Sequence, residues 1–456
     1  PRTTLDTGKP FDVANEAAPT EVPASPQVEL PEAQEETGGE TLSNISKAAT
    51  LSTNFAGPFK RVAILADISA TVGPNHLLTT LNDDITIQDK VGTQLSKFSL
   101  VSFFNGLPGI TDVFDPRCVY DHTVDRFYIA ACVQRISTKS GIVLAVSATN
   151  NPLGPWHKWH FIADQDGTIN EWADYPYLGF SNDKITASSN MFSISNNAFT
   201  GNEVFVFDKS TALDGGAITT NQFSQTNVAG MAPAITYDNT NTQFIVQRFF
   251  GDFGGVGLLQ VFSITGSPFA PVLTPLSPKP SSLPWNTLNP AAPQSGTANK
   301  VLTNDDRLGN VVLRNGSLWT AACVGMPSGT TTTPARTAIR WWQINSTTLV
   351  TTQTGLVQDT TNTFYYYFPS ITVNANNEVM LGFSGSSAST FISSMFAYRG
   401  PTTPVNTMEA PAVIKAGEGA WTQATRRWGD YTMTVTDPSD GLTMWTLQEY
   451  AKTGGG

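Results

Sequence analysis

A single motif recurs along most of this chain: a short apolar strand, a turn rich in Asn, Asp, Gly or Pro, and a second apolar strand. One copy runs from Asp115 to Cys132, with a polar turn at 121–125. Further copies occupy 175–189, 233–248, 309–322, 368–383 and 430–447. Each copy is typical of a β-hairpin. Landmark residues in successive copies lie 57 to 76 residues apart, which leaves room for more strands and loops between hairpins.

A seventh hairpin is expected at 72–90, ahead of the others. Apolar runs between the hairpins, such as Gly141–Ser147 and Asn202–Asp208, predict second strand pairs. A lone four-stranded sheet exposes two edges and two partly apolar faces, and these faces are buried when several sheets pack around one axis. The sequence therefore predicts an all-β fold: residues 58–456 form a β-propeller of about seven four-stranded blades. A pair of stacked sheets is the main alternative.

Two segments bear on how this ring is completed. The last hairpin stops soon after Tyr450, so its blade lacks outer strands, and we expect the apolar run Phe59–Leu65 to supply one. The run 266–298, rich in Pro, Ser and Ala, is expected to leave the ring as a long loop on one face.

The N-terminal region differs from the rest. Residues 1–50 hold nine acidic residues, three basic residues and six prolines, and their one aromatic residue is Phe11. Such a segment buries too little apolar surface to offset its ordering entropy. We therefore expect residues 1–57 to form an extended acidic, Pro-rich arm, which either wraps its own propeller or lies on a neighbouring copy of the chain.

Composition narrows the possible partners. Charged residues make up only 14% of the chain, and 26 basic against 37 acidic residues give a net charge of −11. An acidic surface repels phosphate backbones, so nucleic acid is not an expected partner. No run of about 18 apolar residues is present, so no membrane-spanning segment is expected. The chain begins at Pro1 without Met, which suggests a removed leader or a longer precursor.

The three cysteines match no zinc-binding spacing. Cys118 and Cys132 flank a turn and are positioned to face each other across a hairpin, although their register, and therefore a disulfide between them, stays open. All three cysteines lie in apolar runs typical of buried strands.

Three stretches resemble a known group. Val72–His76 with Asp84–Gly92 resembles an opening blade, Glu171–Pro176 a middle blade and Arg427–Tyr431 a closing blade of secreted bacterial sialidase-like (Asp-box-type) β-propellers. Most members of that group have no assigned activity. The nearest run to an Asp-box, Ser147–Trp156, is degenerate, since Thr149 replaces the Asp.

The resemblance implies where a catalytic site would lie if the protein were an enzyme. A sialidase-like site needs an arginine cluster, a tyrosine nucleophile and an acid. Arg117 and Arg248 lie near the ends of predicted strands, where they could both face one opening of the propeller's central channel. The catalytic candidates are Asp174, Tyr175, Arg307, Arg427, Asp430 and Tyr431. The competing interpretation, which we favour, is that the Trp-x-Asp-Tyr motifs lock blades together.

Metal and cofactor signals are weak. Asp164 and Asp166 sit in a run that loosely matches a calcium loop but lacks the closing Glu. Calcium is therefore the one candidate metal, and no other cofactor is expected. No nucleophile-elbow, zinc-protease, P-loop or dinucleotide fingerprint occurs in a suitable context.

These observations favour a non-enzymatic protein. We expect a secreted or cell-surface propeller that acts as a structural binding or assembly module and tiles into a layer or filament through its arm. Its expected partners are copies of itself, another extracellular protein or a glycan. The alternative is a carbohydrate-active enzyme, a sialidase-like glycosidase or polysaccharide lyase, with its site at the propeller mouth.

Overall fold

A computed structural model describes residues 51–453 apart from 59–64, 164–169 and 329–332. The described chain is almost entirely β-structure, in seven consecutive antiparallel units that we call blades A to G. The two helices are short: α1 (Leu100–Phe103) follows blade A, and α2 (Lys209–Asp214) lies within blade C. A membrane-spanning helix is absent from the described residues, where both helices are far too short for that role.

The first three blades each have four strands. Blade A contains β1 (Ser69–Val72), β2 (His76–Thr80), β3 (Asp84–Asp89) and β4 (Gln94–Ser99). Blade B contains β5 (Val113–Asp121), β6 (Arg126–Val133), β7 (Gly141–Ser147) and β8 (Trp156–Ile162). Blade C contains β9 (Glu171–Phe180), β10 (Lys184–Ser193), β11 (Phe199–Asp208) and β12 (Thr220–Thr226).

The remaining blades vary in strand number. Blade D contains β13 (Ala232–Thr236), β14 (Gln243–Phe250), β15 (Gly257–Thr265), β16 (Val272–Pro275) and the short β17 (Ser281–Ser282). Blade E contains β18 (Leu308–Arg314), β19 (Ser317–Met326), β20 (Arg336–Asn345) and β21 (Thr351–Val357). Blade F contains β22 (Tyr365–Val373), β23 (Val379–Ser387), β24 (Thr390–Arg399) and β25 (Ala412–Lys415). Blade G contains β26 (Met433–Thr436) and β27 (Met444–Leu447).

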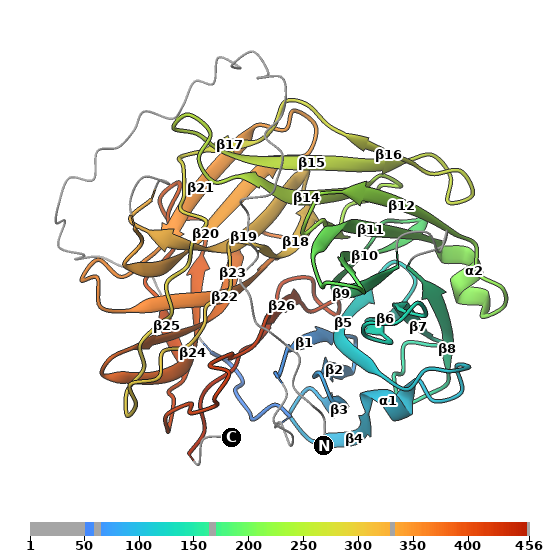
Figure 1. Ribbon diagram of the computed structural model, residues 1–456, viewed down its shortest axis with the longest axis horizontal. Coiled ribbons are helices and arrows are strands. Elements are labelled where there is room, and N and C mark those ends of the chain that lie inside the picture. Colours follow the sequence, from blue (N-terminus) through green and yellow to red (C-terminus); the bar gives the residue numbers. More distant parts are fainter. Residues whose placement is uncertain (1–50, 59–64, 164–169, 329–332, 454–456) are drawn as a thin grey trace.

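The blades are arranged around one axis (Figure 1). The first strand of each blade contacts the first strand of the next, and β26 of blade G contacts β1 of blade A, so the ring closes. In the middle of the ring β13 even pairs with β9 and β18 as a parallel strand. The predicted all-β propeller is confirmed, and the alternative of two stacked sheets is wrong.

The two-stranded blade G is contacted by blade A and by the segment that precedes it. Lys90 Nζ lies 2.8 Å from Asp437 Oδ1, which joins blade A to blade G. The ring of Phe55 packs 6.2 Å from that of Trp445 on β27, and the side-chain amide of Asn54 donates to the carbonyl of Ile414 in blade F at 3.1 Å. The end of the predicted arm thus lies along blades F and G. The rest of that arm, and the expected closing strand apart from Leu65, lie outside the described residues.

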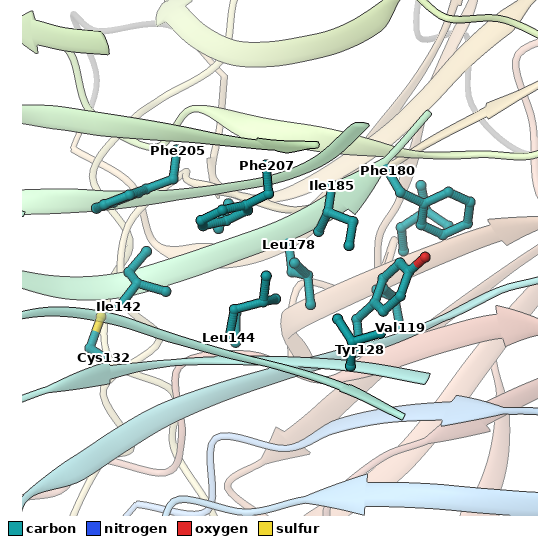
Figure 2. Close-up of a cluster of buried hydrophobic side chains, with 14 of the residues drawn as sticks. Val119, Tyr128, Cys132, Ile142, Leu144, Leu178, Phe180, Ile185, Phe205 and Phe207 are labelled. Carbon is teal, nitrogen blue, oxygen red and sulfur yellow. The ribbon is translucent and has the colours of Figure 1, made fainter. Parts of the chain in front are cut away.

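The core lies between the blades, because alternate residues of each strand face opposite neighbours. Figure 2 shows the layer between blades B and C, where Leu144 and Tyr128 face Leu178, Phe180 and Phe207. All five side chains are at most 6% exposed. Radial packing therefore buries both faces of a blade, and this removes the need for one large sandwich core.

The same alternation determines which neighbouring blade each of two cysteines faces. Cys118 faces blade A, in a cluster with Leu78 and Ile87. Cys132 faces blade C, in a cluster with Phe180. The two thiols therefore lie on opposite faces of blade B, and all three cysteines are buried and free.

The hairpin predictions differ from the structure at two places. The expected hairpin at 72–90 is the middle of blade A, β2 and β3, because its inner strand β1 (Ser-Ala-Thr-Val) is too short and polar to be recognised. The long run 266–298 holds β16 and β17 before it crosses blades E and F, where the amide of Gly325 donates to the carbonyl of Asn286 at 2.9 Å. The expected excursion is thus partly blade structure.

Candidate functional site

The inner strands of four blades carry a β-bulge near their start, and the four bulges lie at the same end of the ring. In blade B the ladder skips from Phe114 to Arg117. The skipped Asp115 has a left-handed φ of 52° and precedes a proline. Blades C and F have φ values of 52° and 53° at Tyr175 and Phe368, again before proline. Because a bulge re-aims the side chains around it, the repeat brings polar groups from several blades together.

We call this group the axial polar cluster and the end of the ring where it lies the mouth face. The members come from blades A, B and C and from the connections that lead into blades A, E and G. They are Asp67, Asn82, Asp115, Arg117, Asp174, Tyr175, Tyr177, Asn304, Asp305, Arg307, Arg427, Asp430 and Tyr431.

Asn82 links the acidic members. Its side-chain nitrogen donates to Asp67 Oδ2 at 2.5 Å and to Asp115 Oδ1 at 3.3 Å, and its oxygen accepts the amide N–H of Asp115 at 2.6 Å. The amide N–H of Asp430 donates to Asp67 Oδ1 at 2.7 Å, across 363 residues of sequence. These bonds connect the first two blades to the last one, so they contribute to ring closure.

The aromatic members surround one guanidinium. Arg117 lies 3.3 Å over the ring of Tyr431 and within 5.4 Å of the rings of Tyr175 and Tyr177. Its Nε donates to the carbonyl of Pro176 at 2.9 Å. Cation–π contacts of this kind stabilise a desolvated guanidinium by up to about 2 kcal/mol each.

The three tyrosine hydroxyls are all used within the protein. Each donates to a backbone carbonyl: Tyr175 to Asp430 at 3.3 Å, Tyr177 to Leu308 at 2.7 Å and Tyr431 to Pro116 at 3.0 Å. Burial raises the pKa of all three phenols above the ordinary value. This shift opposes formation of a phenolate nucleophile.

The arginines at the mouth are also engaged. Arg307 makes a two-pronged pair with Asp305, with Nε–Oδ1 at 2.7 Å and Nη2–Oδ2 at 2.9 Å. Arg427 Nη2 lies 2.6 Å from Asp430 Oδ2, and Asn304 donates to the other oxygen of that carboxylate at 3.0 Å. Their side chains are 15% and 19% exposed. Both guanidiniums thus already bind carboxylates of this chain.

Three carboxyls hold protons more tightly than usual. Burial, and then the negative charge of Asp115, raise the pKa of Asp174 well above its ordinary range, and a hydrogen bond between the two carboxyls adds to the effect. Burial and the charge of Asp430 also raise the pKa of Asp67 and Asp115. The carboxyls of Asp174 and Asp115 thus both lose a proton less readily than a free carboxyl.

All six residues predicted from the sequence lie in this cluster. Asp174 and Tyr175 stand at the bulge of β9, Arg307 precedes β18, and the segment 427–431 leads into β26. The prediction missed Asp67, Asn82 and Asp115, although an Asp-Pro step at the start of the repeat pointed to the last of them. Arg248, the other expected arginine, pairs with Asp306 at 3.0 Å beside the cluster.

The open space at the mouth is small. One hollow is lined by Asn190, Gly230, Arg248, Asp305 and Arg307, and a second lies on the axis below it. The free interior of each is about 10 Å³, which admits one water molecule. Ligand pockets usually enclose about 300–1,000 Å³. Neither of these two hollows is therefore large enough to hold a sugar ring.

No group of His, Cys, Asp and Glu in the described part of the chain is arranged to hold a metal ion. The calcium candidates Asp164 and Asp166 lie outside the described residues.

No protein-family model matches the chain, and no curated protein matches it. Distant structural likenesses include β-propeller proteins, among them family-43 glycoside hydrolases and carotenoid oxygenases. A thermostable family-43 glycoside hydrolase is 14% identical, with 70% of this chain and 99% of that one covered and a TM-score of 0.33. A Synechocystis apocarotenoid oxygenase mutant is 10% identical, with 80% and 76% covered and a TM-score of 0.43. A protein of unknown function from Dyadobacter fermentans is 9% identical, with 70% and 86% covered and a TM-score of 0.38. Strand pairing and ring order define the fold independently of these likenesses.

Proposed function

We propose that this protein is a non-catalytic β-propeller that acts as a binding or assembly module outside the cell. The observation that carries the proposal is the internal use of the axial polar cluster. Its tyrosine hydroxyls donate to backbone carbonyls, and Arg307 and Arg427 bind carboxylates of the same chain. The tyrosine hydroxyls are thereby used to join blades, and each of the two guanidiniums is paired with a carboxylate of its own connection.

The opposite face of the ring supports a contact role. Since neighbouring strands are antiparallel, the turn between the third and fourth strands of blades A to F lies away from the mouth face. Blades A, B, D, E and F each place one exposed apolar side chain in this outermost connection. These are Val91, Leu153, Phe269, Val350 and Val405, between 44% and 75% exposed. We call them the apolar rim.

A single exposed apolar side chain is common on protein surfaces. An exposed apolar side chain in the same connection of five blades favours a shared role. Blade C has helix α2 in the corresponding connection. A rim of separated apolar side chains suits a broad protein partner better than a small molecule. The partner we propose is a second copy of this chain or another extracellular protein, with the acidic arm as a further contact.

Sedimentation velocity of the full chain tests this function. We expect concentration-dependent association that is lost in the triple variant Val91→Glu, Phe269→Glu, Val405→Glu. The matched control is Leu283→Glu with Leu288→Glu, which alters side chains 55% and 63% exposed on the mouth face and should leave association unchanged. The proposal would be refuted by a wild-type chain that stays monomeric up to about 100 µM and captures no extracellular protein through the rim. That concentration lies well above the dissociation constant of a typical specific complex.

One observation favours a second candidate, a carbohydrate-active enzyme of the sialidase-like type that the sequence resembles. Asp174 keeps its proton at higher pH than a free carboxyl because of burial and Asp115, and glycosidases use such a group as a general acid. Glycan-hydrolysis and lyase panels distinguish the two functions. Turnover by the wild type that falls at least 100-fold in Asp174→Asn would favour the enzyme, and no turnover supports the binding module.

A further inference from the structure

The second hollow lies inside the ring, where inner strands from blades A to E and G meet. Its polar lining comes from Ser69, Arg117, Tyr177 and Asn310, and the rest is mostly apolar, including Val119 and Met433. No carboxylate lines it among the described residues. The charge at its wall is therefore the positive charge of Arg117.

Arg117 is not neutralised by an ion pair. The residue is 4% exposed, and in the described ranges no carboxylate lies within ion-pair distance of its guanidinium. The tyrosine rings cover its flat faces, but the N–H groups point outward in the plane of the guanidinium. Nε has the carbonyl of Pro176 as acceptor, whereas Nη2 is buried without any acceptor.

A buried cation with an unused donor is costly unless a counter-charge or acceptor reaches it. A second donor faces the same space. The hydroxyl of Ser69 accepts the amide N–H of Cys118 at 3.0 Å and the thiol of Cys118 at 3.7 Å, which leaves its own hydrogen for a ligand. The hydroxyl of Tyr177 and the amide of Asn310 are already occupied by Leu308 and Ile371.

We propose that the axial hollow is a binding site for one small monovalent anion, held by Arg117 Nη2 and the Ser69 hydroxyl. In ordinary buffers this anion is chloride. The free interior of about 10 Å³ favours a small ion over a carboxylate- or phosphate-bearing molecule. Because Arg117 contacts blades C and G from blade B, the anion stabilises the closed ring by accepting the unused N–H of Arg117 Nη2. This role is independent of the proposed function.

The test compares the thermal midpoint of the full chain in sodium chloride and in sodium gluconate at equal ionic strength. We expect a saturable increase in chloride, about 3 °C at a chloride concentration one hundred times the Kd. Arg117→Met should remove the difference between the salts. Arg340→Met is the matched control, since Arg340 is also buried, at 2% exposed, and lies away from the hollow.

A crystal of the wild-type protein soaked in sodium bromide gives a direct readout that does not depend on a variant folding. An anomalous peak beside Arg117 Nη2 confirms the site. Equal midpoints in the two salts, a chloride effect that persists in Arg117→Met, or an ordered water without anomalous signal at that position would each overturn the proposal.

Discussion

Removing Tyr431 tests whether the axial polar cluster joins the last blade to the ring. The side chain is 1% exposed and its ring lies 5.6 Å from that of Tyr175, edge to face. Arg117 lies over its face at 3.3 Å. The hydroxyl donates to the carbonyl of Pro116 at 3.0 Å, which connects residues 315 apart in sequence. Tyr431 thus contributes a hydrogen bond, an aromatic contact and a cation–π contact across the axis.

The expected costs follow from these contacts. Tyr431→Phe removes only the hydroxyl and leaves the Pro116 carbonyl buried, which should lower the free energy of unfolding by about 1–2 kcal/mol. Tyr431→Ala also removes the buried ring, at about 3–5 kcal/mol, and the cation–π contact, at up to about 2 kcal/mol. We therefore expect about 5 kcal/mol or more for the alanine variant, a large part of the total stability of a typical domain.

Urea unfolding followed by tryptophan fluorescence measures both values. Tyr367→Phe serves as the control for one buried hydroxyl, because Tyr367 donates to Ser386 at 2.8 Å within blade F. The two phenylalanine variants should lose similar amounts, and only Tyr431→Ala should lose several kcal/mol. A Tyr431→Ala protein within 1 kcal/mol of the wild type would refute the placement of this side chain at the axis.

Three further predictions test ring closure, charge and packing. Carbodiimide treatment should crosslink Lys90 to Asp437, because Lys90 Nζ and Asp437 Oδ1 lie 2.8 Å apart. If other ion pairs of the monomer are crosslinked and the Lys90–Asp437 peptide is missing, the closed ring is contradicted. Burial and neighbouring carboxylates raise the pKa of Asp174, so its contribution to stability is present below about pH 4 and lost as pH rises through the folded pKa. Asp174→Asn should flatten the fall in Tm as the pH rises above about 4, and an unchanged Tm profile would show that the pKa of Asp174 is not raised. Phe180→Ala should cost about 3–5 kcal/mol in urea unfolding because the ring is 0% exposed, whereas the rim variant Phe269→Ala should cost under about 0.5 kcal/mol; equal costs would refute the inter-blade core.

The hairpins were predictable because their physics is local. Each has an apolar strand, a turn with a residue suited to its backbone, and a second apolar strand, as in the turn that ends at Asp125 with a φ of 55°. Strand β1 was missed because Ser69–Val72 has little apolar character and is buried by neighbours far away in sequence. The closure of blade G was unpredictable for the same reason, since Lys90 and Asp437 meet only once the ring is formed.

The candidate site was predicted in part. Asp174, Tyr175, Asp430 and Tyr431 were found because each Trp-x-Asp-Tyr motif marks the start of an inner strand, and all inner strands start at the mouth face. Asp67 carries no such local mark and joins the cluster through Asp430, 363 residues away. The preference for a blade-locking role over a catalytic one agrees with the hydrogen bonds of the tyrosines, and it stays a prediction until activity is assayed.

A crystal structure of the full chain tests the central claim, a closed ring of seven blades, most directly. We predict electron density with seven inner strands around one axis, β26 beside β1, and the amide nitrogen of Asp430 bonded to the carboxylate of Asp67. Density in which the last hairpin packs away from blade A, or in which the strands form two facing sheets, would contradict it.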